Sequence, residues 1–185
     1  MRVDRIEVKR CFVASNKAKE LRGKDKAAFL AGLAGIEREV RSMTEFDLDK
    51  SISPNWPPRL KKYNELVWYF EECSIDDLGA WYGAGELPEE WCIGSVRDTI
   101  RCIKQALKEG KRFPGRAFDN VPGIVKVVDM ILNSQLLAPI VVPGGTWRQL
   151  PCLKMKGDID DGCMRVIAFA LSGHEKLKAY IGKSK

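Results

Sequence analysis

The run Gly157-Asp158-Ile159-Asp160-Asp161-Gly162-Cys163-Met164-Arg165 joins a predicted strand to a predicted helix through a glycine. A bend of this kind leaves free backbone N–H groups and the positive end of the helix dipole at one point. Arg165, one turn into the helix, adds a planar guanidinium that can donate two parallel hydrogen bonds to an anion. The bend is therefore the predicted site, and a phosphate group is its predicted ligand.

Length and composition are those of a folded domain. The chain has 185 residues, of which 45% are hydrophobic and 30% charged, and these proportions are typical of a protein with a substantial core. Its longest apolar segments are interrupted by Lys126, Asp129 and Pro139, so the sequence predicts no membrane-spanning helix. The first residues lack the apolar core of a signal peptide. We therefore expect a cytoplasmic protein.

The chain is basic, with a formal net charge of +6 and a pI near 9.0. Such a charge favours an anionic partner, namely nucleic acid, nucleotide or phosphate, although solubility alone also accounts for it. Five basic residues gather in the middle of the sequence and form either a basic patch or a solvated helix face: Lys104, Lys108, Lys111, Arg112 and Arg116.

Cysteine and histidine do not suggest a metal centre. The six cysteines contain no C-x-x-C pair, and His174 is the only histidine in the sequence. A zinc site would have to be assembled from distant thiolates, so we interpret the cysteines mainly as small core residues.

Hydrophobic periodicity predicts the elements of the first half. We expect a strand over residues 3–13 and amphipathic helices over residues 24–43 and 59–73. Ser74 has the spacing of a capping box and predicts a short helix through Trp81. Ser95 caps a further helix, which Gly110 ends.

The pattern changes after a basic connector at residues 111–120. A helix from Pro122 is followed by strands over residues 136–142 and 150–159, the helix after Gly162, and a closing strand over residues 176–181. The predicted fold class is α+β. It comprises a mainly helical N-terminal extension, residues 1–112, and a small mixed-sheet core, residues 113–185.

The C-terminal third resembles the ParB/sulfiredoxin-like superfamily. Members carry a strand of the form Leu-Leu-x-Pro-Ile/Val and, later, a D-G-x-x-R or G-C-H-R motif that opens a helix. Here these are Leu136-Leu137-Ala138-Pro139-Ile140 and Asp161-Gly162-Cys163-Met164-Arg165. The resemblance covers roughly residues 118–183 and implies a nucleotide- or phosphate-binding site at Gly162, Cys163, Met164 and Arg165.

The activities that the resemblance implies are diverse: free-serine kinases, sulfiredoxins, CTP-hydrolysing partition proteins, and nucleases. The sequence departs from the pattern at Met164, which replaces the usual histidine. A thioether neither donates a hydrogen bond nor carries charge to a phosphate. The doubled arginine of the partition proteins is also missing, whereas Gly162, Cys163 and Arg165 match the sulfiredoxin motif.

Several residues have a catalytic and a structural interpretation. Asp161 is a candidate general base or Mg²⁺ ligand, or an N-cap of the helix. Cys163 is a candidate thiolate at a helix start, or a small buried residue. Asp119 matches the region where superfamily kinases place an acidic catalytic residue, but it could also cap a helix. Asp158 and Asp160 either join Asp161 at a metal or are exposed charges on a strand face, which we favour.

The function predicted from these observations is binding of ATP or another nucleotide with Mg²⁺, followed by phosphoryl transfer or nucleotide hydrolysis. Two alternatives stay open. One is a DNA-binding or nuclease-type protein that uses its basic surface, and the other is thiol-based repair of the sulfiredoxin kind through Cys163.

Overall fold

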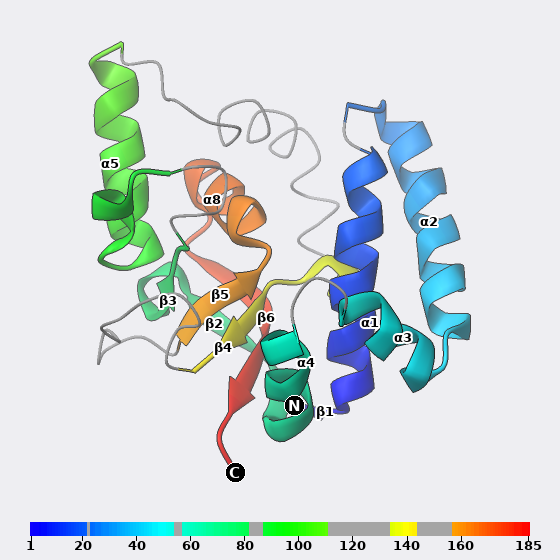
Figure 1. Ribbon diagram of the computed structural model, residues 1–185. Coiled ribbons are helices and arrows are strands. Elements are labelled where there is room, and N and C mark those ends of the chain that lie inside the picture. The colour runs from blue at the N-terminus through cyan, green and yellow to red at the C-terminus, as the bar shows by residue number, and fades with distance from the viewer. Residues whose placement is uncertain (22, 54–56, 82–86, 111–133, 144–156) are drawn as a thin grey trace.

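The computed structural model describes residues 1–21, 23–53, 57–81, 87–110, 134–143 and 157–185. In these ranges the chain has an α+β fold, with one mixed sheet between two groups of helices (Figure 1). The strands are β1 (Arg2–Val3), β2 (Val67–Ser74), β3 (Leu78–Gly79), β4 (Ile140–Val142), β5 (Gly157–Asp161) and β6 (Lys176–Lys183). The helices are α1 (Arg5–Lys17), α2 (Lys26–Ser42), α3 (Glu45–Ile52), α4 (Pro57–Glu65), α5 (Val96–Lys108) and α8 (Cys163–Leu171). Short 3-10 helices are η1 (Ala18–Leu21), η2 (Ile75–Asp77), η4 (Glu89–Cys92) and η5 (Gln135–Leu137).

The sheet has the strand order β1-β2-β6-β4-β5-β3. β2 and β6 are antiparallel along their whole length, β4 is parallel to β6, and β5 is antiparallel to β4 and parallel to β3. Strands β1, β2 and β3 precede the boundary predicted between residues 112 and 113, and strands β4, β5 and β6 follow it. The N-terminal half therefore contributes strands to the same sheet as the C-terminal half.

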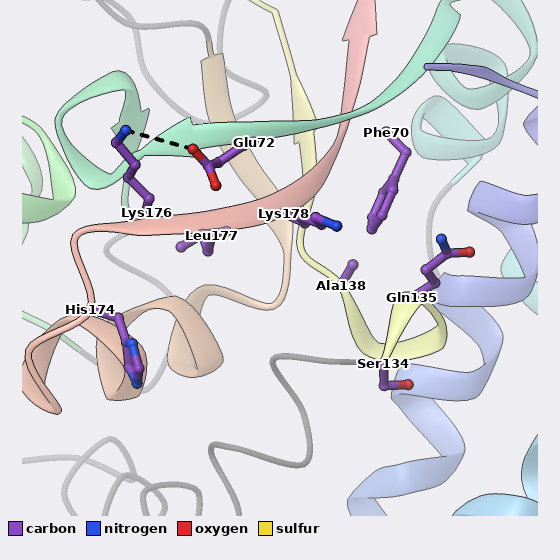
Figure 2. A pocket seen from close by; sticks show the side chains of 9 residues that line it. All are labelled: Phe70, Glu72, Ser134, Gln135, Ala138, His174, Lys176, Leu177 and Lys178. Atoms are coloured by element: carbon purple, nitrogen blue, oxygen red, sulfur yellow. Dashed lines mark ion pairs between the residues drawn. The ribbon is translucent and has the colours of Figure 1, made fainter.

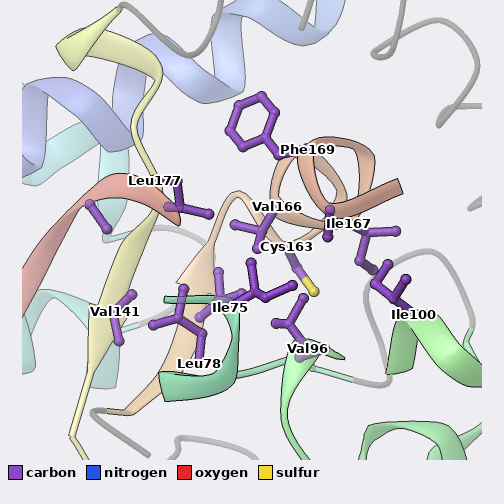
Figure 3. Close-up of a cluster of buried hydrophobic side chains, with 14 of the residues drawn as sticks. Ile75, Leu78, Val96, Ile100, Val141, Cys163, Val166, Ile167, Phe169 and Leu177 are labelled. Atoms are coloured by element: carbon purple, nitrogen blue, oxygen red, sulfur yellow. The ribbon is translucent and has the colours of Figure 1, made fainter. Parts of the chain in front are cut away.

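The two faces of the sheet carry separate hydrophobic cores, because neighbouring residues on a strand point to opposite faces. Val141 and Ile181 belong to the core beneath α5 and α8, part of which is drawn in Figure 3. Ile140 and Tyr180, one position away on each strand, belong to the core beneath α1, α3 and α4. The middle of the sheet is thus buried on both sides, whereas Glu72, Lys176 and Lys178 on β2 and β6 are exposed.

Four predicted elements are confirmed. The helix predicted over residues 24–43 is α2, the helix after Ser95 is α5, the helix after Gly162 is α8, and the closing strand is β6. In α5, Ser95 and Asp98 form a reciprocal capping box, which satisfies backbone donors that the first turn leaves unpaired.

The strand predicted over residues 3–13 is wrong, because most of this segment is α1. The Asp4 side chain accepts a hydrogen bond from the backbone of Ile6 at 2.8 Å and caps the helix. Val8, Cys11 and Phe12 are buried at steps of three and four residues. These residues therefore follow a helical period rather than a strand alternation.

The helix predicted over residues 59–73 is also wrong beyond Glu65, where α4 ends and β2 begins. The segment Val67-Trp68-Tyr69-Phe70 is β-branched and aromatic, a composition that favours strands. The short helix predicted from Ser74 is a single 3-10 turn, η2, which leads into β3. The pairing of β2 with β6 and of β3 with β5 therefore outweighed the helical spacing of the apolar residues in these two segments.

The strands that flank the bend differ from their predicted bounds. The strand predicted over residues 136–142 is η5 followed by β4, and the strand predicted over residues 150–159 is β5, which ends at Asp161. Residues 150–156 lie outside the described ranges. β5 lies between β4 and β3, and both Asp158 and Asp160 are buried. Their interpretation as exposed charges is wrong.

A buried lysine joins α1 to α3. Lys9 is fully buried, and its ammonium lies 2.6 Å from carboxylate oxygens of Glu45 and Asp49. Arg5 also binds Glu45, with its Nε donating at 2.7 Å. The hydrogen bonds from Arg5 and Lys9 lower the pKa of Glu45 from 4.5 to about 2.

This lowered pKa predicts how stability depends on pH. A carboxyl group whose pKa is lower in the folded state stabilises the protein above its unfolded-state pKa, and this contribution disappears as the pH falls to the folded-state pKa. We expect Glu45→Gln to lower the Tm by a constant amount above pH 4.5 and by progressively less between pH 4.5 and 2. Circular dichroism melting curves across this range measure the difference. Glu65→Gln is the control, because Glu65 and Lys61 are exposed and 3.8 Å apart; equal pH profiles for the two variants would contradict the prediction.

None of the helices in the described ranges combines the length and the apolar composition needed to cross a membrane.

Candidate functional site

The bend between β5 and α8 has the conformation that the sequence predicts. Gly162 occupies the N-cap position of α8 with φ +90° and ψ 14°, a left-handed conformation that glycine adopts without steric cost. A Cβ atom at this position would lie 2.6 Å from the Arg165 Nη2 atom. Glycine is therefore required here both by the backbone conformation and by the close approach of Arg165.

Arg165 folds back over the bend. The residue is only 9% exposed, and its Nη2 donates a hydrogen bond to the Asp161 carboxylate at 2.7 Å. Its Nε is buried and has no hydrogen-bond partner among the described residues. A buried donor without a partner costs about 1–3 kcal/mol. The described residues therefore leave this Nε–H donor unsatisfied.

Asp161 has the ion pair with Arg165 as its principal contact. The helix N-cap is Gly162, which makes no side-chain capping bond, so the interpretation of Asp161 as the N-cap is wrong. The ion pair spans four residues, and both side chains are largely buried. Asp161 therefore holds the guanidinium against the bend.

A second buried ion pair lies directly beside the first. The Asp160 side chain is 1% exposed, and one of its carboxylate oxygens accepts hydrogen bonds from Arg59 Nε and from the Tyr63 hydroxyl, both at 2.7 Å. Arg59 also lies 4.7 Å from the centroid of the Phe12 ring, within the range of a cation–π interaction. Helices α1 and α4 thus secure the end of β5.

The charges in this region act on neighbouring titratable groups. Burial and the Asp160 charge raise the pKa of Tyr63 well above its ordinary value. Burial opposes the charged form of Arg59, but Asp160, Tyr63 and Asp161 together outweigh it, so the pKa of Arg59 is raised. Both groups therefore keep their protons, and Tyr63 remains a donor to Asp160.

Cys11 completes what we call the buried polar cluster, which consists of Cys11, Arg59, Tyr63, Asp160, Asp161 and Arg165. The Cys11 thiol donates to the Ala138 carbonyl at 3.1 Å. Burial raises the pKa of this thiol, and the charges of Arg165 and Asp161 act on it in opposite directions. With two arginines and two aspartates, the cluster is formally neutral.

The remaining predicted site residues are placed as follows. Cys163 is buried in the core beneath α8, and its Sγ lies 4.0 Å from the Trp81 carbonyl oxygen. Met164 is half-buried and packs against the same core. Asp119 lies outside the described residues. Of the predicted residues, the structure therefore brings together Asp161, Gly162 and Arg165 at the face of the bend.

The carboxylates near the bend do not form a cation site. Asp161 is paired with Arg165, and Asp160 is paired with Arg59. Within the described ranges, no group of three or more histidine, cysteine, aspartate or glutamate side chains is placed to hold a metal ion. A guanidinium at 2.7 Å already neutralises Asp160 and Asp161, so these two residues do not fit Mg²⁺.

Three members of the cluster were not identified from the sequence: Cys11, Arg59 and Tyr63. Arg59 and Tyr63 precede Asp160 by 101 and 97 residues, and no local motif marks them. Only the packing of α1 and α4 on the sheet brings them to the bend.

Comparisons of this chain with protein-family models, with curated proteins and with solved structures find no match.

Proposed function

We propose that the β5–α8 bend binds the phosphate group of a nucleotide, with ATP as the first candidate, and that the protein catalyses phosphoryl transfer or nucleotide hydrolysis. The observation that carries the proposal is the position of Arg165 over Gly162, with a buried Nε that lacks a partner in the described structure. The first-turn N–H groups of α8 start at the same bend, where the helix dipole favours an anion. The resemblance of Asp161-Gly162-Cys163-Met164-Arg165 to the superfamily motif supports the same ligand.

Electrostatics decide how such a ligand would bind. The buried polar cluster is formally neutral, so it exerts no large net attraction on an anion. Binding must come from local donors, namely the helix amides and the Arg165 guanidinium. A phosphate would compete with Asp161 for the Nη2 donor of Arg165. When the phosphate accepts this hydrogen bond, the Asp161 carboxylate is released from its ion pair.

The released carboxylate gives Asp161 its proposed role. A carboxylate beside a bound phosphate can accept the proton of an attacking hydroxyl group or water, and this form of catalysis contributes about 10²–10⁴-fold. Most of the remaining rate gain would come from positioning and charge neutralisation by Arg165 and the amides. Because the carboxylates at the bend do not fit Mg²⁺, we propose that the metal enters as the magnesium–nucleotide complex.

A thermal-shift screen of ATP, ADP, CTP and GTP, each with and without Mg²⁺, tests the proposal. A ligand at 100 times its Kd stabilises the folded state by about 2.7 kcal/mol, which raises the Tm of a chain of this size by about 5–10 °C. We expect Arg165→Met to remove this shift. Arg101→Met is the control, because Arg101 is exposed on α5. A folded Arg165→Met protein that keeps the full shift would contradict the proposal.

Asp161→Asn separates binding from catalysis. The substitution removes the competitor for Arg165 and a negative charge beside the phosphate, so we expect an equal or larger nucleotide-induced shift. Turnover should fall by about 10²–10⁴-fold because the base is lost. Retention of turnover in this variant would exclude Asp161 as the base while leaving the binding proposal intact.

Binding of nucleic acid is the second candidate function. On α5, Arg97, Arg101, Lys104 and Lys108 follow one another at steps of four, three and four residues, which places them on one side of the helix. Arg97 and Arg101 already form ion pairs with acidic neighbours, which weakens this candidate relative to the first. Affinity for DNA that falls steeply with salt and ignores nucleotides would favour it.

Thiol-based repair receives less support. Reactive cysteines are partly exposed and lie in electropositive surroundings, whereas Cys163 is 6% exposed within the hydrophobic core.

A further inference from the structure

A groove of about 330 Å³ lies over β2 and β6, apart from the bend. Figure 2 shows the side chains that line it, which come from the two strands, from η5 and from the segment after α8. The volume is at the lower end of the range for small-molecule pockets. The bend belongs to β5 and α8, so the groove is a second place on the sheet, and the inference below does not rest on the proposed function.

Lys178 supplies the groove with a positive charge. In the sheet register it stands opposite Glu72, but the Glu72 carboxylate lies 3.7 Å from the Lys176 ammonium, an ion pair that Figure 2 marks with a dashed line. Lys178 forms no ion pair with any residue in the described ranges, and it is exposed. Its ammonium is therefore free to receive an anion from solvent.

Phe70 supplies a flat apolar wall next to this charge. Its ring projects into the groove beside the Lys178 side chain (Figure 2). The ring also packs on Tyr180, with 4.9 Å between the centroids. This contact restrains the orientation of the Phe70 ring. A second ring could stack on the free face of Phe70, in an arrangement that contributes about 0.5–1.5 kcal/mol beyond burial.

Polar groups stand at both ends of the groove. His174 lies at one end, and Gln135 and Ser134 lie at the other (Figure 2). Imidazole, carboxamide and hydroxyl groups all donate hydrogen bonds to oxygen acceptors. The groove thus combines a flat apolar surface, an ammonium group and neutral donors.

We propose that this groove binds a small molecule that carries an anionic group beside a flat ring. The ring stacks on Phe70, the anion pairs with Lys178, and the donors at the ends contact its remaining oxygens. The pairing of Glu72 with Lys176 leaves the positive charge of Lys178 uncompensated, and this selects an anion over a cation.

An NMR titration of the full chain tests the proposal, with phenyl phosphate and benzoate as probes that join a ring to a phosphate or a carboxylate. Inorganic phosphate, benzyl alcohol and benzylamine present the anion alone, the ring alone, and the ring with the opposite charge. We expect saturable shifts of the Phe70, Leu177 and Lys178 backbone amides with one or both of the first two probes. Which of the two binds identifies the anionic group. Equal binding of the other three probes, or no saturable shift, would overturn the proposal.

Matched variants locate the binding. Lys178→Ala should weaken the phenyl phosphate or benzoate complex by about tenfold or more, because a charge-assisted hydrogen bond is lost. Lys183→Ala is the control on the same strand, because the Lys183 ammonium pairs with Glu71 and lies over Tyr69. Lys178→Glu should abolish binding of phenyl phosphate and benzoate and should allow benzylamine to bind, because the charge in the groove is reversed. Phe70→Leu keeps an apolar side chain while it removes the stacking surface.

The same titration separates the groove from the bend. Shifts confined to residues 162–165 that disappear with Arg165→Met would place the probe at the bend and reject the groove. Shifts at Phe70 and Lys178 that persist in Arg165→Met would support the groove, whatever the outcome of the nucleotide screen.

Discussion

Replacing Arg59 with methionine is expected to lower the free energy of unfolding by about 3–5 kcal/mol, because it removes one partner of a buried ion pair. The Asp160 side chain is 1% exposed, and its carboxylate accepts hydrogen bonds from Arg59 and from Tyr63. Urea denaturation measures the change, and the slope of free energy against urea should stay constant if only stability is altered. Since small proteins have stabilities of about 5–15 kcal/mol, the effect is large.

Arg101→Met provides the matched control for this prediction. Arg101 also pairs with an aspartate, Asp98, but its side chain is 72% exposed, and exposed ion pairs contribute about 0–1 kcal/mol. A triple variant, Arg59→Met with Tyr63→Phe and Asp160→Leu, should recover most of the lost stability, because replacing a whole buried polar group by apolar residues is often neutral. Equal losses for Arg59→Met and Arg101→Met would show that the burial of the Asp160 pair has no energetic consequence.

Replacing Trp68 with alanine is expected to cost a similar amount, about 3–5 kcal/mol, through the cavity that it leaves. Trp68 is 1% exposed, its ring packs edge-on to Tyr63 at 5.5 Å, and its indole N–H donates to the Tyr63 carbonyl at 3.0 Å. The substitution therefore also loosens the residue that holds Asp160. Differential scanning calorimetry measures the change in Tm.

Tyr69→Ala is the control for Trp68→Ala, since Tyr69 is the next residue on β2 and is only half-buried. We expect a clearly smaller loss there. Trp68→Phe should fall between the two, because it keeps a ring but loses the hydrogen bond to the Tyr63 carbonyl. If Trp68→Ala changed the Tm no more than Tyr69→Ala, the support that Trp68 gives to Tyr63 would be excluded.

Local signals predicted the elements whose determinants are close together in the chain. Ser95 and Asp98 are three residues apart and cap α5 reciprocally. Gly162 adopts the positive φ that a strand-to-helix bend requires, and Arg165 reaches it from one turn away. In each case the interacting groups lie within a few residues, so their geometry follows from the backbone alone.

Predictions failed where distant pairing decided the structure. The segment from Val67 to Ser74 has apolar residues at spacings that fit a helix, but it pairs along its whole length with β6, more than 100 residues later. Asp158 and Asp160 alternate with Ile159 as exposed charges would, but β5 is an inner strand. Short apolar runs do not reveal which face of a sheet will be covered.

The sequence by itself determined the α+β class, the ends of α5 and α8, and the glycine bend with its arginine, because short-range backbone geometry and capping specify these features. Only the tertiary structure decided that the N-terminal half shares the sheet, and that Arg59, Tyr63 and Cys11 enclose the end of β5. Those contacts depend on how α1 and α4 pack against strands about a hundred residues away. The free energy of such packing comes from the burial of whole surfaces, which no local pattern of residues encodes.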